Sequence, residues 1–406
     1  MHVAFVEPSF PVNQRRFVLG LKKVGARVTG IGEIPAEGLH PELQAALDDY
    51  VRVPSVVHEP ALHQAVRALQ ERGPVDRLEA TVEAHILPVA HVREACGIPG
   101  TTSRTAFLCR DKPAMKEVLR EAGIPCARST GASRPEEVRA FAGEVGFPLI
   151  LKPRDAAGAA GTYKAVDEAS LEEAIRDCGL DRGAPAAVEE FIEGHEGFFD
   201  TLSIEGQPVY EFICHYYPNV LPAMRNRWPA PRIVMTNRND APGYTEVREL
   251  CQRVLQALGI WTSPTHMEWF YGPKGLRFSE IGCRPPGVCV WDLYCAGNEF
   301  DLYEEWARAV CYGTVEARPS RRFAAGMVSI RPDRDGIVAG YEGVEEIERE
   351  FGEWLIDYHL PPPGTRTQPI EGGYMANGWV RMRHPDYDVL CGLLEEVGRR
   401  LRLYAR

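Results

Sequence analysis

Long apolar segments and an export signal are both missing from the sequence. No stretch approaches the roughly 18 unbroken apolar residues that a membrane span requires. The opening run Val3-Ala4-Phe5-Val6 is preceded by no basic region and followed by no small-residue cleavage site. These absences predict a cytoplasmic protein without a membrane partner.

Paired cysteines and net positive charge are also missing. Eleven cysteines occur without one CxxC pair, which favours reduced core thiols over disulfides. Cys283, Cys289 and Cys295 are evenly spaced, but neither helix nor hairpin geometry explains that period, so no metal is expected there. The formal charge of −11 opposes bulk attraction to a polyanion, and nucleic acid is not expected as a partner.

Two nucleotide-binding signatures are absent as well. The opening segment lacks GxGxxG, so an NAD-dependent oxidoreductase has little support. The glycine-rich stretch after Lys152 lacks the GK[ST] ending, so it is not a Walker A loop.

What is present is a chain of 406 residues with 45% apolar and 25% charged residues, enough for two or three packed domains. Short apolar runs alternate with amphipathic stretches over residues 2–100, which is typical of βαβ units and a parallel sheet. The expected class is α/β (α+β multidomain). The expected domains are a Rossmann-like one over 1–105, a linker helix and lid over 106–195, and a mixed α/β one over 196–406.

Glu268 and Glu280 flank a predicted turn at Pro273-Lys274-Gly275. If these three residues form the loop, with Gly275 left-handed, Glu268 lies directly opposite Glu280. A two-residue loop would instead oppose Glu268 to Ser279. Facing carboxylates about 5 Å apart repel unless a cation lies between them, and Mg²⁺ binds one or two carboxylates plus substrate phosphates. The pair predicts a magnesium clamp; two solvated glutamates are the alternative.

Two lysines provide cations for an anionic ligand. Asp111-Lys112-Pro113 starts a helix with proline in its first turn, and Lys152 ends the apolar strand 147–152. The small-residue loop after Lys152, including Gly158, Gly161 and Thr162, could bring backbone amides close to phosphate oxygens. A plain surface turn explains the glycines equally well.

The acidic run 189–196 follows an apolar strand. Its backbone could pair with an adenine while a carboxylate takes the ribose hydroxyls. Taken alone, the run fits a solvated sheet edge as well.

The order of these elements resembles the ATP-grasp superfamily, in its carboxylate-amine ligase and biotin carboxylase-like branches. The resemblance covers nearly the whole chain and includes the ending E-x-[NG]-x-R-P-x-G at 280–287. It implies an ATP-grasp fold, ATP, and one or two Mg²⁺ ions, with Mn²⁺ able to substitute.

The resemblance also implies roles for single residues. Lys112 and Lys152 would hold the ATP phosphates, and Gly158, Gly161 and Thr162 would belong to the lid loop. The hinge would bind the nucleoside through Glu189, Glu190, Phe191, Ile192 and Glu196, with Glu190 and Ile192 at the adenine and Glu196 at the ribose. Glu268 and Glu280 would ligate magnesium.

Arg284 matches the family arginine that faces the acyl phosphate or the substrate carboxylate, a task suited to a planar fork of donors. A structural salt bridge is its alternative role. Gly282 stands where many members have asparagine, a further metal ligand, so the second magnesium is in question. His266 should lie opposite Gly282, and we hypothesise that His266 or a water fills that position; a packed histidine is the alternative.

Candidates for the substrate pocket lie mainly in an irregular stretch of the third domain, which could offer aromatic walls and carboxylate-binding forks. They are His215, Tyr216, Tyr217, Arg225, Arg227, Trp228, Arg232 and His266. A surface loop with stacked arginines is the alternative.

The resemblance implies an ATP-dependent carboxylate-amine ligase that forms an amide bond through an acyl phosphate. Its expected partners are a small-molecule carboxylate and amine, and a homodimer stays open because the family often dimerises. One alternative is a carboxylase or formyl-phosphate transferase of the biotin carboxylase and purine-pathway type. Another is a catalytically silent nucleotide-binding module.

Overall fold

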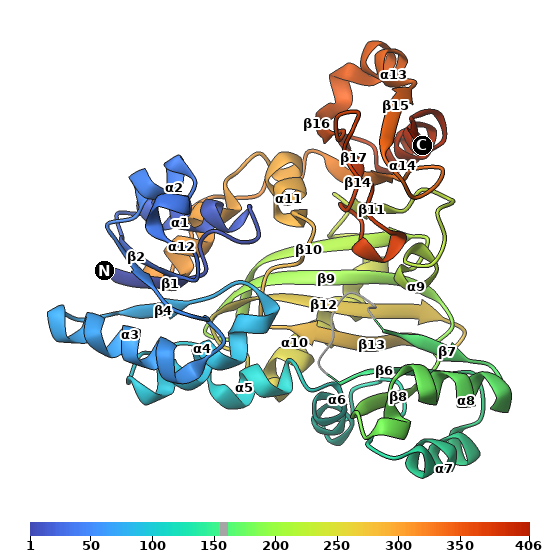
Figure 1. Cartoon of the computed structure of the whole chain (residues 1–406), viewed down its shortest axis with the longest axis horizontal. Helices are drawn as coiled ribbons and strands as arrows, with labels where there is room; N and C mark the ends of the chain where they lie inside the picture. Colours follow the sequence, from blue (N-terminus) through green and yellow to red (C-terminus); the bar gives the residue numbers. More distant parts are fainter. Residues whose placement is uncertain (155–160) are drawn as a thin grey trace.

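The computed structural model of the chain describes residues 1–154 and 161–406. Three sheets dominate these residues, and a fourth sheet has two strands. Figure 1 shows the N-terminal sheet and its helices on one side of the longest sheet, and the small sheet with α7 and α8 below its other end. No described helix is long and apolar enough to cross a bilayer.

The N-terminal sheet has four parallel strands in the order β3-β2-β1-β4, which confirms the prediction from the βαβ pattern. Every residue of β1 is buried, as expected for a parallel sheet covered on both faces. Its strands are β1 (His2–Val6), β2 (Arg27–Gly32), β3 (Asp49–Arg52) and β4 (Arg77–Glu79), and its helices are α1 (Gln14–Lys23), α2 (Pro41–Ala46), α3 (Glu59–Arg72) and α4 (Glu83–Ala95).

Two helices connect this sheet to the small sheet: α5 (Ser103–Leu108) and α6 (Lys112–Glu121). The start of α6 is the predicted one, because Asp111 caps it by accepting a hydrogen bond from the Ala114 N–H at 3.0 Å, and Pro113 occupies its first turn. The small sheet has the order β5-β8-β6-β7, all antiparallel. Its elements are β5 (Ser129–Ala132), α7 (Pro135–Val145), β6 (Leu149–Pro153), β7 (Tyr163–Ala165), α8 (Glu168–Asp177) and β8 (Ala186–Glu190).

The longest sheet has eight antiparallel strands in the order β13-β12-β9-β10-β11-β14-β17-β16. Its strands are β9 (His195–Ile204), β10 (Gln207–Tyr217), β11 (Arg232–Met235), β12 (Ser263–Gly272), β13 (Gly275–Gly282), β14 (Ala324–Ile330), β16 (Leu355–His359) and β17 (Gly378–His384). The remaining elements are α9 (Val220–Ala223), α10 (Thr245–Leu258), α11 (Val290–Asn298), α12 (Leu302–Tyr312), β15 (Val338–Glu342), α13 (Val344–Phe351), α14 (Tyr387–Arg400) and β18 (Arg402–Ala405).

Helix α12 packs against α1 of the N-terminal sheet, although the two are far apart in sequence (Figure 1). Phe17 of α1 meets Trp306 of α12 with ring centroids 5.0 Å apart, and both side chains are buried. The N-terminal sheet therefore completes its core with a helix from the C-terminal half. The expected domain boundaries at 105/106 and 195/196 stay predictions.

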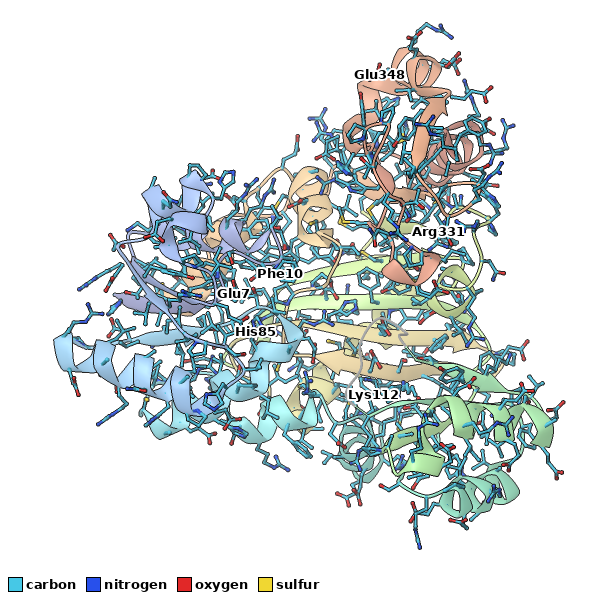
Figure 2. The ribbon with its side chains drawn as sticks, viewed as in Figure 1. Glu7, Phe10, His85, Lys112, Arg331 and Glu348 are labelled. Atoms are coloured by element: carbon cyan, nitrogen blue, oxygen red, sulfur yellow. The ribbon has the colours of Figure 1, made fainter. Side chains whose placement is uncertain are left out.

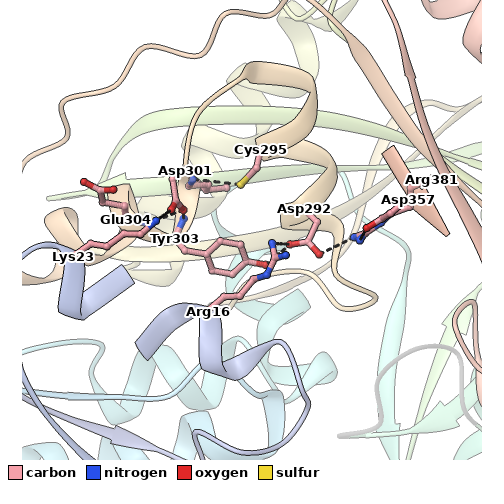
Figure 3. A network of polar contacts seen from close by, with 10 residues as sticks. Arg16, Lys23, Asp292, Cys295, Asp301, Tyr303, Glu304, Asp357 and Arg381 are labelled. Carbon is pink, nitrogen blue, oxygen red and sulfur yellow. Dashed lines mark hydrogen bonds and ion pairs between the residues drawn. The ribbon is translucent and has the colours of Figure 1, made fainter. Parts of the chain in front are cut away.

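A row of ion pairs joins the same two regions to the C-terminal strands (Figure 3). Asp292 of α11 pairs with Arg16 of α1 at 2.6 Å and with Arg381 of β17 at 2.7 Å. Arg381 also pairs with Asp357 of β16. The Arg381 side chain is 7% exposed and that of Asp292 11%, so the charges are shielded from water and depend on one another.

Asp292→Asn removes the charge that faces two arginines while keeping the side-chain shape. We expect the free energy of unfolding, measured with urea, to fall by about 2 kcal/mol, because losing one partner of a buried pair is costly. Lys23→Gln is the matched control. It removes the exposed pair Lys23–Asp301 and should change stability by less than about 1 kcal/mol. Equal losses of stability from the two substitutions would contradict the conclusion that Asp292 and its arginines are shielded from water.

Candidate functional site

The β12–β13 hairpin brings Glu268 directly opposite Glu280, as the sequence predicts. The predicted loop is wrong, because Gly272 pairs with Gly275 and only Pro273 and Lys274 lie between the strands. Gly275 is left-handed, with φ at +72°. A bulge between the pairs Glu268–Glu280 and Trp269–Phe278 takes up one extra residue on β13. The bulge, rather than the loop length, sets the register.

One face of the eight-stranded sheet carries this pair. Glu268 pairs with Phe198 of β9, and Phe198 pairs with Cys214 of β10, so these side chains share a face. Tyr216, two residues beyond Cys214, lies on the same face, and its hydroxyl donates to Glu268 Oε1 at 3.3 Å. Tyr216 belongs to the stretch that the sequence predicts to form the substrate pocket, and its side chain reaches the carboxylate pair.

His215 and Tyr217 point to the opposite face, which corrects their prediction as substrate-pocket residues. The His215 ring nitrogens lie 2.9 Å from His195 Nε2 and 2.8 Å from the Tyr244 hydroxyl. The Tyr217 hydroxyl lies 3.0 Å from that of Tyr387. Successive strand residues alternate between the two faces of a sheet. Tyr216 therefore points to the face that carries Glu268, and its two neighbours point away from it.

Three lysines converge beside the carboxylate pair. Lys112 lies 3.7 Å and Lys152 3.5 Å from Glu280 Oε2. Lys116, one helical turn after Lys112, lies 2.7 Å from Glu189 Oε2 and is 1% exposed. Both α6 lysines belong to its buried stripe with Met115 and Leu119, and their i, i+4 spacing was the signal that could have identified Lys116.

Glu189 connects these cations. Its Oε2 also lies 3.2 Å from Lys152, while its Oε1 is buried without a hydrogen-bond partner among the described residues. Burial disfavours the charged carboxylate, but Lys116 and Lys152 outweigh it and lower the pKa of Glu189. Glu189 was predicted to bind the nucleotide. It holds two lysines and also lines the cleft between the small sheet and the eight-stranded sheet, so that role stays a prediction.

Lysines also determine the ionisation of Glu280. Burial opposes its charged form, but Lys112 and Lys152 outweigh that effect and lower the pKa of Glu280 to about 2. Glu196 behaves in the opposite way, because burial and the nearby Glu268 raise its pKa to about 8. The lysine side of the site is built for anionic oxygens.

A cleft between the small sheet and the eight-stranded sheet contains most of the predicted nucleotide residues. Its lining includes Lys112, Lys152, Thr162, Glu190, Phe191, Ile192 and Glu196, together with Glu268 and Glu280. Glu190 is already engaged through its side chain with Lys274, and its backbone N–H donates to the Arg128 carbonyl at 2.8 Å. Lys164 lies over the Phe191 ring at 3.6 Å.

Other predicted residues surround this cleft. Glu196 is buried and accepts a hydrogen bond from the Val220 N–H at 2.7 Å. Gly161 is left-handed, with φ at +64°, and Gly158 lies outside the described residues. The Thr162 carbonyl accepts a hydrogen bond from Arg225 at 2.6 Å.

A second cavity adjoins the first and shares Lys112 and Glu280 with it. Arg284 lines this cavity, and its Nε donates to Glu83 Oε2 of α4 at 2.5 Å. The N-terminal sheet thereby supplies one wall next to the carboxylate pair. Gly282 leaves room for this pair, because a Cβ there would lie 3.1 Å from Glu83 Oε2 and 3.3 Å from Arg284 Cγ and would crowd both side chains.

Comparisons with known proteins agree with this arrangement. Residues 111–194, which contain all three lysines, match the family described as carbamoyl-phosphate synthase L chain, ATP binding domain. The chain is 30% identical over 288 residues to an L-arginine-specific L-amino acid ligase of Bacillus subtilis, a match that covers 69% of this chain and 68% of that protein. The chain belongs to the ATP-grasp superfamily.

Two further similarities support the ATP-grasp assignment. The chain is 27% identical over 281 residues to a formate-dependent phosphoribosylglycinamide formyltransferase of Chlorobium phaeobacteroides, covering 68% of this chain and 69% of that protein. It superposes on the crystal structure of an L-amino acid ligase from Bacillus licheniformis with a TM-score of 0.78 and 18% identity, covering 100% and 98% of the two chains. The predicted ATP-grasp fold is confirmed, and the chain is an enzyme of the ligase type.

The donor set of this ATP-grasp site suits magnesium. Glu268 and Glu280 offer hard carboxylate oxygens that face each other across two strands. Within residues 1–154 and 161–406, no group of three or more His, Cys, Asp or Glu side chains could hold a metal unaided. The two carboxylates would therefore bind Mg²⁺ jointly with phosphate oxygens, the usual arrangement for this ion.

The remaining predicted substrate residues, Arg227, Trp228 and Arg232, are not among the described residues that line either cavity. Arg227 pairs with Asp335 at 2.8 Å, and Trp228 stacks under Arg402 at 4.7 Å. These two contacts fit the alternative of a structured surface loop.

A residue that sequence reasoning missed is Arg331, which follows β14. It is 3% exposed, donates through Nη1 to the carbonyls of Ala223 and Asn226, and has no described hydrogen-bond partner for Nη2. The hydroxyl of Tyr374 is likewise buried and without a described partner. The only signal for Arg331 in the sequence was a single arginine after an apolar strand, a pattern that is common.

His266 pairs opposite Gly282 in the predicted register. Its Nδ1 lies 2.8 Å from Asp200 and its Nε2 3.5 Å from Glu268. Burial disfavours its charged form, but Asp200 and Glu268 outweigh it and raise the pKa of His266 to about 9. The imidazole thus stands beside a predicted magnesium ligand, and the hypothesis that it fills the position left by Gly282 stays a prediction.

We expect His266→Ala to raise the magnesium concentration needed for half-maximal ADP release several-fold, because Glu268, a predicted magnesium ligand, would lose the imidazole that lies 3.5 Å from it. The measurement is a magnesium titration at saturating ATP. His195→Ala, on the opposite face of the sheet, is the control. Unchanged magnesium dependence and turnover in His266→Ala would exclude a role for the imidazole at the metal position.

Proposed function

We propose that the chain joins a small carboxylic acid or amino acid to an amine, forming an amide through an acyl phosphate and releasing ADP and phosphate. The observation that carries the proposal is the convergence of Lys112, Lys152, Glu268 and Glu280 in one cleft. That cleft continues into a second cavity lined by Arg284. One space suits a triphosphate, and the other suits the group that receives its terminal phosphoryl.

Positioning and charge neutralisation supply most of the catalysis in phosphoryl transfer. Lys112 and Lys152 would hold phosphate oxygens, and Glu189 keeps Lys152 in place at 3.2 Å. When bound between Glu268 and Glu280, Mg²⁺ would neutralise phosphate charge and align donor with acceptor. No serine or cysteine nucleophile is needed, because the phosphoryl group passes directly to the substrate.

The reaction requires two bond exchanges. A carboxylate oxygen attacks the γ-phosphorus, and the bond from that phosphorus to the bridging oxygen breaks, leaving ADP. The amine nitrogen then attacks the acyl carbon, the carbon–oxygen bond to phosphate breaks, and the nitrogen loses a proton. Arg284, held by Glu83 at 2.5 Å, would orient the carboxylate and then stabilise the departing phosphate.

Amide formation is favoured over other ATP-grasp reactions by the named relatives. Both the Bacillus subtilis protein and the Bacillus licheniformis structure are amino acid ligases by name. The second cavity also combines cationic Arg284 with anionic Glu83, which suits substrates that carry both a carboxylate and an ammonium group.

Formyl transfer is a second candidate. It rests on the similarity to the formate-dependent formyltransferase, which covers nearly the same share of this chain as the match to the amino acid ligase. Formate or bicarbonate would then replace the larger acid. The two candidates differ in whether a one-carbon acid is sufficient for ADP release.

The experiment is an ADP-release screen of amino acids in pairs, with formate and bicarbonate as separate arms and mass spectrometry of the products. We expect a product whose mass equals acid plus amine minus water. ADP release with formate or bicarbonate would favour the second candidate. ATP binding without ADP release across the panel would contradict both and indicate a silent module.

Glu280→Gln should lower ADP release at least about 100-fold, because it removes a predicted metal ligand and the counter-charge of two lysines. Glu193→Gln is the matched control, since Glu193 is an exposed glutamate in the segment 189–196. Its ADP release should match the unsubstituted protein. Normal turnover in Glu280→Gln would refute the proposed phosphoryl-transfer site.

A further inference from the structure

The loops after β1 and β4 meet at the point in the N-terminal sheet where the strand order reverses. From β1, the chain continues to β2 on one side, while β4 lies on the other. The Thr81 hydroxyl after β4 donates to Gln14 Oε1 at the start of α1, which joins the two loops. Parallel sheets commonly bind ligands in the crevice at such a point, outside the carboxyl ends of the strands.

Glu7 provides a buried carboxylate at this point. It directly follows β1, is 6% exposed, and has a left-handed backbone with φ at +53°. Its carboxylate accepts hydrogen bonds from the Ser9 hydroxyl and, at 3.2 Å, from the Glu33 N–H. No lysine, arginine or histidine in the described part of the chain forms an ion pair with it. A buried carboxylate without a counter-charge is costly unless a cation arrives from outside.

His85 is the second, independent observation. It lies in the first turn of α4, is 8% exposed, and its Nδ1 is buried with no hydrogen-bond partner among the residues described. Buried polar atoms without partners are rare in native proteins. Burial lowers the pKa of His85, and Glu7 and Glu33 act in the opposite direction, so both carboxylates lie within electrostatic reach of the ring.

Phe10 and Val12 add an apolar border from the loop that follows Glu7. They are 70% and 67% exposed, the largest exposed fractions among the large apolar side chains of the described residues. Figure 2 shows Glu7, Phe10 and His85 gathered at the side of the N-terminal sheet that faces the eight-stranded sheet. The feature combines an unpaired carboxylate, an unused imidazole nitrogen and apolar surface.

The first turn of α4 connects this feature to the reaction centre. Glu83, two residues before His85, holds Arg284 in the second cavity. Glu83 and His85 thus place the second cavity and this feature on the same helical turn. A molecule that extended from Arg284 along this turn would meet an anionic and apolar environment at its far end.

We propose that Glu7 and His85, bordered by Phe10 and Val12, form a subsite for the far end of the amine substrate. The substrate class is a primary amine that carries a second cationic group on an apolar stem, as in basic amino acids. This inference rests on the proposed ligase function and adds its substrate class. The cationic group pairs with Glu7, donates a hydrogen bond to His85 Nδ1, and its stem packs on Phe10.

The test is calorimetric binding of L-lysine and of L-norleucine, which has the same chain length but no terminal ammonium. Both titrations use the full chain saturated with a non-hydrolysable ATP analogue and magnesium. We expect L-lysine to bind at least tenfold more tightly than L-norleucine. Glu7→Gln should remove that preference and leave L-norleucine unchanged, and His85→Leu should reduce it.

Glu37→Gln is the matched control, because Glu37 is an exposed glutamate of the same sheet's loops, and it should keep the full preference. Phe10→Ala, at a 70% exposed position, should fold normally and weaken both amino acids alike. Equal binding of the two amino acids, no binding of either, or an intact preference in a folded Glu7→Gln variant overturns the subsite. Since no turnover is needed, absent ADP release in the pair screen would overturn the ligase proposal separately.

Discussion

The architecture depends on the mutual neutralisation of charges buried where three parts of the chain meet. Lys112 and Lys116 come from α6, Lys152 and Glu189 from the small sheet, and Glu280 from the eight-stranded sheet. None of these charges could be buried alone without a large desolvation cost. The need to balance these charges brings the three parts of the chain together, and the lysines line the cleft between them.

Sequence reasoning identified the residues of this balance that follow strong local rules. Asp111 and Pro113 mark the start of α6, and period-two alternation places Glu268 and Glu280 on one face. The correct pairing of the two glutamates nevertheless followed from a wrong loop, because the hairpin has a two-residue turn and a bulge. A bulge inserted at Ser279 has no sequence signature, since serine fits a regular strand position equally well.

The sequence did not predict which face of the strands holds the site, because both faces are buried and the usual alternation of polar and apolar residues is missing. Nearly every residue of β9 and the last half of β10 is buried, so alternation of polar and apolar residues does not mark which face holds the site. The sequence proposed His215, Tyr216 and Tyr217 together, but His215 and Tyr217 point away from the carboxylate pair, while Tyr216 contacts Glu268. Lys116 was hidden for a related reason: a lysine in a helix is usually solvated, and only the distant Glu189 makes its burial possible.

Gly282 shows how a departure from the family pattern can reflect a constraint from another domain. Asparagine there would add a metal ligand, but its Cβ would press on Glu83 and Arg284 at 3.1 and 3.3 Å. Glu83 belongs to the N-terminal sheet, so the absent side chain allows that sheet to approach the reaction centre and fix Arg284. Arg284, the predicted carboxylate-binding arginine, is thus held by a residue of the N-terminal sheet. Under the proposed function, this ion pair would couple substrate choice to phosphoryl transfer, in a space that a side chain at position 282 would crowd.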